Sequence, residues 1–302
     1  MTKAVILAAG SASRMQDNLE RFLEDGEELT AVRKGEKMAA RFSRFPFLDY
    51  QLLSLARAGV RDVGIVLRPD ETFFIDYYGR IGGALFPELR IGFSFQETPD
   101  GTAHAVLAAE RFAGKGPFLV LNGDNHYPCR LVRMLVEAPE GFSAVAAFDT
   151  LGFGKRTRKK LGSFAVLRTV EGRLADIVEK PPKPEDHLTS DSLYTEGNRR
   201  VRVDRVVLVS MNLWRFEAGI MDACRNVTRH TPRRAGKPGE YELPDAVKLH
   251  MRGGGVFLAY YAREDILDLT RAEDIGIVAG EIRRGLADSV EELERRLARL
   301  SG

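Results

Sequence analysis

Residues 3 to 15 read Lys-Ala-Val-Ile-Leu-Ala-Ala-Gly-Ser-Ala-Ser-Arg-Met. The apolar run over residues 5 to 7 is typical of a buried strand in a parallel sheet. It gives way at Gly10 to small residues, which Arg14 follows. Small side chains let backbone N–H groups approach an anion closely, and an arginine can add a forked contact. Taken alone, the segment fits either a phosphate-binding loop or an ordinary strand-to-loop turn.

Composition indicates a globular protein. Of the 302 residues, 44% are hydrophobic and 29% are charged, which excludes a disordered chain. Cys129 and Cys224 lie far apart, so we expect neither a disulfide framework nor a zinc site. The apolar run after Lys3 is shorter than a signal-peptide core, and no run approaches a membrane span. We therefore expect a cytoplasmic protein without a membrane partner.

Basic residues form two blocks, although the net charge is only +2. The first block is Lys155, Arg156, Arg158, Lys159 and Lys160, and the second is Arg225, Arg229, Arg233, Arg234 and Lys237. Because no aromatic residues interleave with them to stack on bases, we expect no nucleic-acid partner. Solvated loops are the simplest interpretation, and the border of an anion-binding site is another.

Strand-like runs alternate with helical patterns in the first half of the chain. The runs are residues 4–7, 63–67, 91–95, 118–121 and 144–148. Leu48, Leu52 and Leu55 mark one apolar helix face, which Gly59 ends. Such alternation predicts βαβ units, a mainly parallel sheet and ligands at the carboxyl ends of the strands.

The pattern changes beyond residue 150. Strand-like segments of a more mixed kind are residues 163–169, 174–179, 203–209 and 256–261, whereas residues 183–202 and 226–239 look like polar loops. Residues 273–300 look helical and charged, with Leu293, Leu297 and Leu300 on one face. This tail fits either its own core or a second subunit of a homo-oligomer, and the sequence leaves both open.

Four segments follow one another in a particular order. After the opening stretch come Gln96-Glu97-Thr98-Pro99-Asp100-Gly101-Thr102-Ala103-His104-Ala105, then Leu121-Asn122-Gly123-Asp124-Asn125, then Ile177-Val178-Glu179-Lys180-Pro181. Over about residues 3 to 275, their order and spacing resemble the sugar-phosphate nucleotidylyltransferases. That family joins a sugar 1-phosphate to a nucleoside triphosphate and releases pyrophosphate.

The resemblance implies a Rossmann-like three-layer αβα nucleotidyltransferase fold of the GT-A-like type, with a mainly parallel mixed sheet. We expect the nucleotidyltransferase domain over residues 1–275. Its nucleotide-binding half would cover about residues 1–150, and its sugar-binding half about residues 151–275. A helical tail would follow at residues 276–302.

The resemblance also implies Mg²⁺ held by two aspartates. Asp124, in Gly-Asp-Asn after a strand, matches the first, and a simple turn is the alternative. Asp268 matches the second, in a segment that lacks the glycine of the family pattern. Asp265 therefore competes with it.

Nucleotidyl transfer needs positive charge on the phosphates more than covalent help. The resemblance implies three catalytic cations: Arg14, Lys37 for the triphosphate and Lys180 for the sugar phosphate. Residues 16–34 look like an inserted charged helix, so Lys34 is a rival of Lys37.

The opening loop would bind the nucleotide through Ala9, Gly10, Ser11, Ala12 and Ser13. Ala12 stands where the family commonly has glycine. If that position needs a positive φ, alanine would strain it and weaken triphosphate binding.

Two further groups resemble recognition positions of the family. Gln96, Gly101 and Thr102 resemble the base-recognition segment, because an amide offers a donor and an acceptor to uracil or thymine, and glycine lets the backbone approach. The residues that resemble sugar-side positions are Glu179, Asn212 and Glu240, of which the last two fit a helix cap or a structural role equally well.

The sequence thus predicts a Mg²⁺-dependent nucleotidylyltransferase that joins a hexose 1-phosphate to UTP or dTTP. One alternative keeps the fold and uses CTP with a phosphorylated alcohol such as phosphocholine. Another is a non-catalytic sugar-nucleotide-binding regulatory protein, which Ala12 and the altered segment at Asp268 favour. A Rossmann dehydrogenase is disfavoured, since the Gly10 loop lacks the G-x-G-x-x-G spacing.

Overall fold

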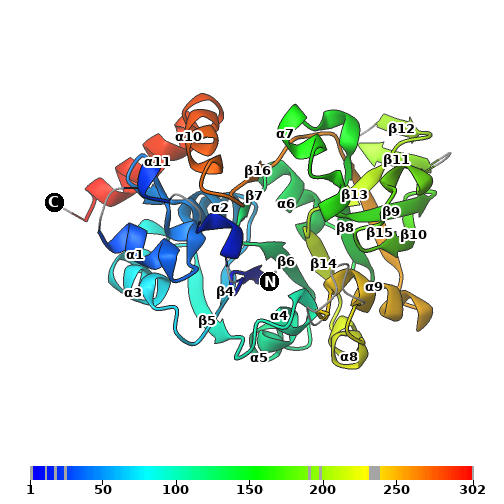
Figure 1. Cartoon of the computed structure of the whole chain (residues 1–302). Coiled ribbons are helices and arrows are strands. Elements are labelled where there is room, and N and C mark those ends of the chain that lie inside the picture. Colours follow the sequence, from blue (N-terminus) through cyan, green and yellow to red (C-terminus); the bar gives the residue numbers. More distant parts are fainter. Residues whose placement is uncertain are drawn as a thin grey trace.

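One mixed sheet of ten strands organises the computed structural model, which describes residues 3–10, 12–16, 19–23, 26–189, 192–196, 199–230 and 239–300. From edge to edge the strands are β13 (Leu208–Ser210), β9 (Ala165–Val170), β10 (Arg173–Val178), β15 (Phe257–Ala262), β8 (Ser143–Asp149), β14 (Trp214–Phe216), β6 (Phe118–Asn122), β1 (Lys3–Leu7), β4 (Asp62–Leu67) and β5 (Arg90–Phe95). The sheet runs through both predicted halves of the chain (Figure 1).

The first half is built on parallel pairing. β1 pairs in parallel with β4 on one side and β6 on the other, and β4 pairs in parallel with β5. These strands match the apolar runs of the sequence, because strands covered on both faces need apolar residues at nearly every position.

Helices cover both faces of the sheet, so the predicted three-layer αβα fold is confirmed. Alternate residues of β1 enter opposite cores: Ala4 and Ile6 pack on one side, and Val5 packs on the other. The first core is covered by α2 (Phe47–Arg57), α3 (Phe73–Leu85), α6 (Cys129–Val136), α10 (Asp274–Gly285) and α11 (Ala287–Ala298). The second is covered by α4 (Thr102–Ala108), α8 (Ile220–Asn226) and α9 (Leu243–Arg252), with the short α5 (Glu110–Ala113) following α4. Among the described helices, none is both long enough and apolar enough to cross a membrane.

Antiparallel pairing enters beyond β6. β14 lies antiparallel between β6 and β8, and β10 lies antiparallel beside β15 and β9. β13 pairs with β9 and also with the end of β8, so this part of the sheet curls back on itself. The strand predicted over residues 203–209 is wrong in part, because only its last residues belong to β13 and Arg205 has a φ of 53°.

The predicted loop over residues 183–202 is also wrong in part. It contains β11 (Ser192–Glu196) and most of β12 (Arg199–Val203), which pair as an antiparallel hairpin. Tyr194 and Val203 are buried in the second core. This packing stabilises strands that the polar composition does not indicate, since strand formation depends strongly on tertiary context.

The charged segment 16–34 forms less helix than predicted. Its described part holds a 3₁₀ turn at Leu19–Arg21 and the helix α1 (Glu27–Arg33). Leu29, Ala31 and Val32 of α1 are buried and belong to the first core. The segment therefore packs on the first core rather than projecting into solvent.

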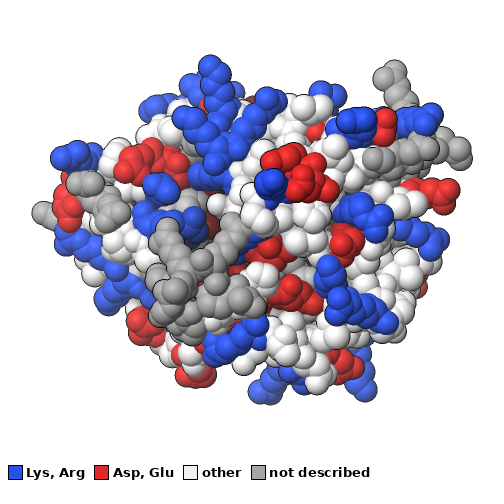
Figure 2. Space-filling view, turned by 45° about the vertical axis from the view of Figure 1, so that its right-hand side comes forward, with Lys and Arg blue, Asp and Glu red and all other residues white. Residues whose placement is uncertain are grey.

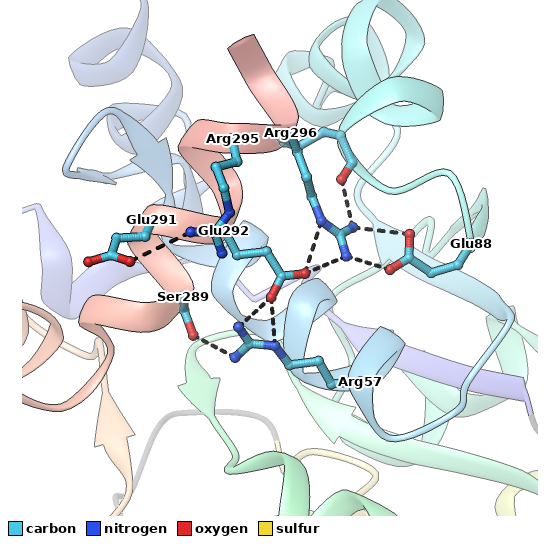
Figure 3. Close-up of polar contacts among 8 residues, drawn as sticks. Arg57, Glu88, Ser289, Glu291, Glu292, Arg295 and Arg296 are labelled. Atoms are coloured by element: carbon cyan, nitrogen blue, oxygen red, sulfur yellow. Dashed lines mark hydrogen bonds and ion pairs between the residues drawn. The ribbon is translucent and has the colours of Figure 1, made fainter. Parts of the chain in front are cut away.

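The C-terminal tail packs on its own chain, where α11 lies beside α3 in the first half (Figure 1). The tail is helical as predicted, and it consists of two helices, α10 and α11. Leu293 of α11 is fully buried. Around it, Arg296 contacts Glu88 at 2.7 Å, and Glu292 receives hydrogen bonds from both Arg296 and Arg57 (Figure 3).

Truncating Leu293 tests how strongly this tail stabilises the first half. Leu293→Ala should lower the free energy of unfolding by about 2–5 kcal/mol, because it leaves a cavity at a fully buried site. Leu300→Ala is the matched control, since this side chain is 45% exposed. Urea unfolding curves of both variants provide the measurement, and equal midpoints would contradict the packing described.

Candidate active site

Two adjoining cavities open at the carboxyl ends of β1 and β6. The first has a volume of about 410 Å³ and the second of about 250 Å³. They share six lining residues: Arg14, Thr102, Asn122, Asp124, Glu240 and Thr270. Every predicted site residue that the structure describes lines one or both cavities, and Ser11 lies outside the described residues.

Strand register explains why these segments meet. Leu7 of β1 lies opposite Val66 of β4 and Asn122 of β6, so the loops that follow leave the sheet at the same edge. Asp124 and Asp268 come together through a short ladder, in which β7 (Asn125–His126) pairs with β16 (Leu267–Asp268). The N–H of Leu269 also donates to the carbonyl of Asp124 at 2.9 Å.

The loop after β1 carries an alanine in a left-handed conformation. Ala12 has a φ of 49°, so the position does need the positive φ that the sequence analysis considered. Arg14 follows in a 3₁₀ turn and is exposed. Among the described residues, Arg14 has no ion-pair partner, which leaves its guanidinium free to contact an anion.

Lys37 lies inside the first cavity and forms an ion pair with Asp124. The two side chains are 13% and 22% exposed. Lys34, its rival, is exposed and lines neither cavity. Asp265 also lies elsewhere, where its carboxylate accepts hydrogen bonds from the N–H of Gly154 at 2.9 Å and the hydroxyl of Thr157 at 2.7 Å.

Lys160 is a site residue that the sequence analysis did not single out. It lines the second cavity, and its Nζ lies 2.5 Å from Asp268 and 3.6 Å from Asp274. The hydroxyl of Thr270 donates to the same Asp268 carboxylate. Lys160 is the last residue of the first basic block. One end of that block therefore borders the second cavity, which is also lined by Lys180. Its pairing with a residue 108 positions away leaves no local sequence signal.

Lys180 lies between two carboxylates in the second cavity. Its Nζ is 2.5 Å from Glu179 and 2.7 Å from Glu242. Burial raises the pKa of Glu179 to about 7, against the attraction of Lys180. Burial also acts to lower the pKa of Lys180, but the two carboxylates outweigh it and the net shift is upward. Lys180 therefore stays protonated at neutral pH.

Glu242 was missed, although it lies two residues after the predicted Glu240. Glu240 is exposed and lines both cavities, whereas Glu242 is buried and accepts a hydrogen bond from the hydroxyl of Thr102 at 3.2 Å. The N–H of Leu243 donates to the same hydroxyl at 2.8 Å. Thr102 thus fastens the segment around residue 242 to the start of α4.

Gln96 is buried beside Gly101. Its side-chain nitrogen donates to the carbonyl of Gly101 at 3.1 Å, which orients its amide. Gly101 has a φ of 112°, and a Cβ there would lie 2.6 Å from the carbonyl oxygen of Tyr241. The structure thus requires glycine at this position because another segment of the chain crosses it closely.

Asn212 joins two strand ends. It has a φ of 57°, and its amide donates to Asn122 at 3.3 Å and accepts from the indole of Trp214 at 3.1 Å. Its side chain is thereby held at the wall of the second cavity.

Basic residues outside the two cavities lie in several clusters. On the face drawn in Figure 2, one large cluster of lysine and arginine lies at the top, and smaller basic and acidic clusters cover the rest. Arg225 pairs with Glu110 and Asp222, and Arg229 lies 3.1 Å from Asp100. Arg233, Arg234 and Lys237 of the second block lie outside the described residues.

Glycine at position 12 should relieve the backbone strain. A left-handed alanine costs about 1–2 kcal/mol, so Ala12→Gly should leave the free energy of unfolding unchanged or raise it by up to about 1 kcal/mol. Ala9→Gly is the control, because Ala9 is buried and does not have a positive φ. It should be destabilising by about 0.5–1 kcal/mol or more. Equal losses for both variants in chemical denaturation would rule out strain at Ala12.

Comparisons with known proteins give the family and the fold of this chain. The chain is 27% identical to a glucose-1-phosphate thymidylyltransferase of Neisseria gonorrhoeae over 66% of this chain and 62% of that protein. It is 27% identical to the bifunctional protein GlmU of Pelotomaculum thermopropionicum over 97% of this chain and 52% of that protein. The chain thus spans between half and two thirds of the length of these curated relatives.

Solved structures share the fold. A UDP-glucose pyrophosphorylase complexed with UDP-glucose superposes with a TM-score of 0.66 at 17% identity, covering 94% of this chain and 99% of that one. The family model described as nucleotidyl transferase matches residues 3–236, which is well over half of the chain. The predicted family is confirmed, and this chain belongs to the nucleotidyl transferases.

Proposed function

We propose that this protein joins a hexose 1-phosphate to UTP or dTTP, with release of pyrophosphate. The observation that carries the proposal is the pair of adjoining cavities, of which the first is lined by Lys37, the second by Lys160 and Lys180, and both by Arg14. Two phosphorylated substrates can then meet where the cavities join. The curated relatives and fold neighbours include proteins named for glucose 1-phosphate, thymidylyl transfer and UDP-glucose, which supports this pair of substrate classes.

The reaction needs one bond made and one broken. An oxygen of the sugar phosphate attacks the α-phosphorus of the nucleotide, and the bond from that phosphorus to the oxygen of the departing pyrophosphate breaks. In our proposal Lys37 contacts the triphosphate in the first cavity, and Lys180 contacts the sugar phosphate in the second. Arg14, without an ion-pair partner among the described residues, would contact the phosphates at the junction.

The carboxylates fit a magnesium ion. Asp124 and Asp268 line the second cavity together, and Mg²⁺ is usually bound by one or two carboxylates with substrate phosphates and water completing its shell. Among the described residues, no group of three or more His, Cys, Asp or Glu side chains could hold a metal without such phosphates. We propose that the two aspartates hold Mg²⁺, which would neutralise charge on the reacting phosphates.

The side-chain amide of Gln96 supports base recognition in the first cavity. Its amide nitrogen uses one N–H on the carbonyl of Gly101, so its carbonyl oxygen and its second N–H remain available to contact a base. Uracil and thymine carry an N3–H that can donate to that oxygen, whereas N3 of cytosine is an acceptor. Gln96 can therefore pair with uracil or thymine through its carbonyl oxygen, and the substrate panel compares these bases with cytosine.

The decisive experiment is a substrate panel. UTP, dTTP, CTP, ATP and GTP are paired with glucose, galactose and N-acetylglucosamine 1-phosphates and with phosphocholine, and pyrophosphate release is measured. We expect release with UTP or dTTP and a hexose 1-phosphate. Nucleotide binding without release in any combination would favour a non-catalytic regulatory protein instead.

Turnover should depend on a divalent ion held by the two aspartates. Asp124→Asn and Asp268→Asn should each lower kcat by about a hundredfold or more, because each removes charge that holds the ion. Asp265→Asn should have kcat close to the wild type, since Asp265 lines neither cavity. Pyrophosphate release at several Mg²⁺ concentrations, with thermal melting as the folding control, makes the comparison. Turnover that survives EDTA would refute the metal role.

Base preference should depend on Gln96. Gln96→Ala should lower kcat/KM for UTP and dTTP by about tenfold to a hundredfold, because the base loses a buried hydrogen-bond partner. The ratio of these kcat/KM values to those for CTP and GTP should fall as well. Glu97→Ala is the control, since its exposed side chain lines neither cavity. An unchanged ratio of kcat/KM values between UTP and GTP would remove Gln96 from base recognition.

A further inference from the structure

Arg68 lies behind the first cavity and is not part of its lining. It follows β4 directly, and its side chain is 14% exposed. Its Nη1 donates to the carbonyl of Gly10 at 3.1 Å, and its Nη2 donates to the carbonyl of Lys34. One guanidinium therefore joins two loops that come from distant parts of the chain. The first is the loop after β1, and the second leads to Lys37.

The loop that leads to Lys37 has a glycine where the guanidinium of Arg68 packs against it. Gly35 has a φ of 106°, and a Cβ there would lie 2.6 Å from Nη1 and 2.7 Å from Nη2 of Arg68. A side chain at this position would therefore displace the guanidinium as well as strain the backbone. Two residues later, Lys37 begins the 3₁₀ turn Lys37–Ala39 that carries it into the cavity.

A buried carboxylate holds Arg68 in place. The side chain of Glu71 is fully buried and accepts a hydrogen bond from the backbone N–H of Arg68 at 2.8 Å. The same carboxylate lies 3.1 Å from Nη1 of Arg68. Since a buried carboxylate needs a charged partner, the guanidinium is fixed by the core while its outer edge contacts the two loops.

We propose that Arg68 is a positioning residue for the nucleoside triphosphate: it couples the Gly10 loop to the Lys37 loop, so that both contact the triphosphate in one geometry. The proposal rests on the nucleotide role proposed for the first cavity. A planar guanidinium can donate to two carbonyls in fixed directions, whereas an ammonium on a flexible stem cannot span both. Small displacements of positioned groups lower rates strongly, so the coupling has a measurable effect.

Arg68→Lys tests the coupling while keeping the charge beside Glu71. We expect KM for the nucleoside triphosphate to rise about tenfold, kcat to fall, and KM for the sugar 1-phosphate to stay within twofold of the wild type. Gly35→Ala should give the same pattern, because its Cβ would push the guanidinium away. Amide hydrogen exchange should become faster at residues 8–10 and 34–40 in both variants.

Arg90→Lys is the matched control. Arg90 makes an ion pair of 2.6 Å with Asp62 at the opposite end of β4, far from the cavities along the strand. It should leave both KM values and the exchange of the two loops unchanged. Thermal melting of all variants reports whether they are folded.

The outcomes separate this proposal from the proposed function. A triphosphate KM within twofold of the wild type in folded Arg68→Lys, or an equal rise of both KM values, would overturn the positioning role. If the wild type turns over no substrate pair, calorimetric binding of UTP and dTTP replaces KM: weaker binding by Arg68→Lys supports the proposal, and equal binding overturns it. A wild type that binds no nucleoside triphosphate would overturn both proposals.

Discussion

The parallel register of β1 with its two neighbours is the constraint on which the rest of the structure depends. Leu7 lies level with Val66 and Asn122, so three chain segments leave the sheet at one height. The residues two positions beyond Leu7, Val66 and Asn122 are Ala9, Arg68 and Asp124, respectively. A slip of one residue in either ladder would turn every side chain of the strand to the other face. The two cores and the cavity loops are therefore fixed together.

The charges in the cavities are arranged in compensating pairs. Glu179, Glu242 and Asp268 are each less than 9% exposed, and each lies against a lysine that comes from another part of the chain or from the next residue. Burying a carboxylate is unfavourable unless it is paired and hydrogen-bonded, and these lysines meet that need. Phosphates entering the cavities would compete with the carboxylates for the same ammonium groups. Additional positive charge would offset this competition, which supports the Mg²⁺ role proposed above.

Sequence reasoning succeeded where local patterns determine structure. The buried strands of the first half show continuous apolar runs, and polar residues at their ends, such as Asp124, meet at one edge of the sheet. It failed where the decisive contact is distant. Lys160 is recognisable only through Asp268, and the β11–β12 hairpin only through the burial of Tyr194 and Val203. Ala12 is an intermediate case. The sequence indicated that this position could need a positive φ, and the backbone of the structure has one.

The position of α11 has a consequence for the order in which the chain acquires its structure. Its polar contacts reach back over 208 residues to Glu88 and 235 residues to Arg57, and Leu293 fills part of the core beneath α2 and α3. During synthesis on the ribosome, the apolar surface over these early helices stays uncovered until residues near 296 have emerged. Proteins whose native contacts join residues far apart in the sequence fold slowly. Apolar surface that stays exposed during this time promotes aggregation. The nascent first half is thus the species that chaperones would have to protect.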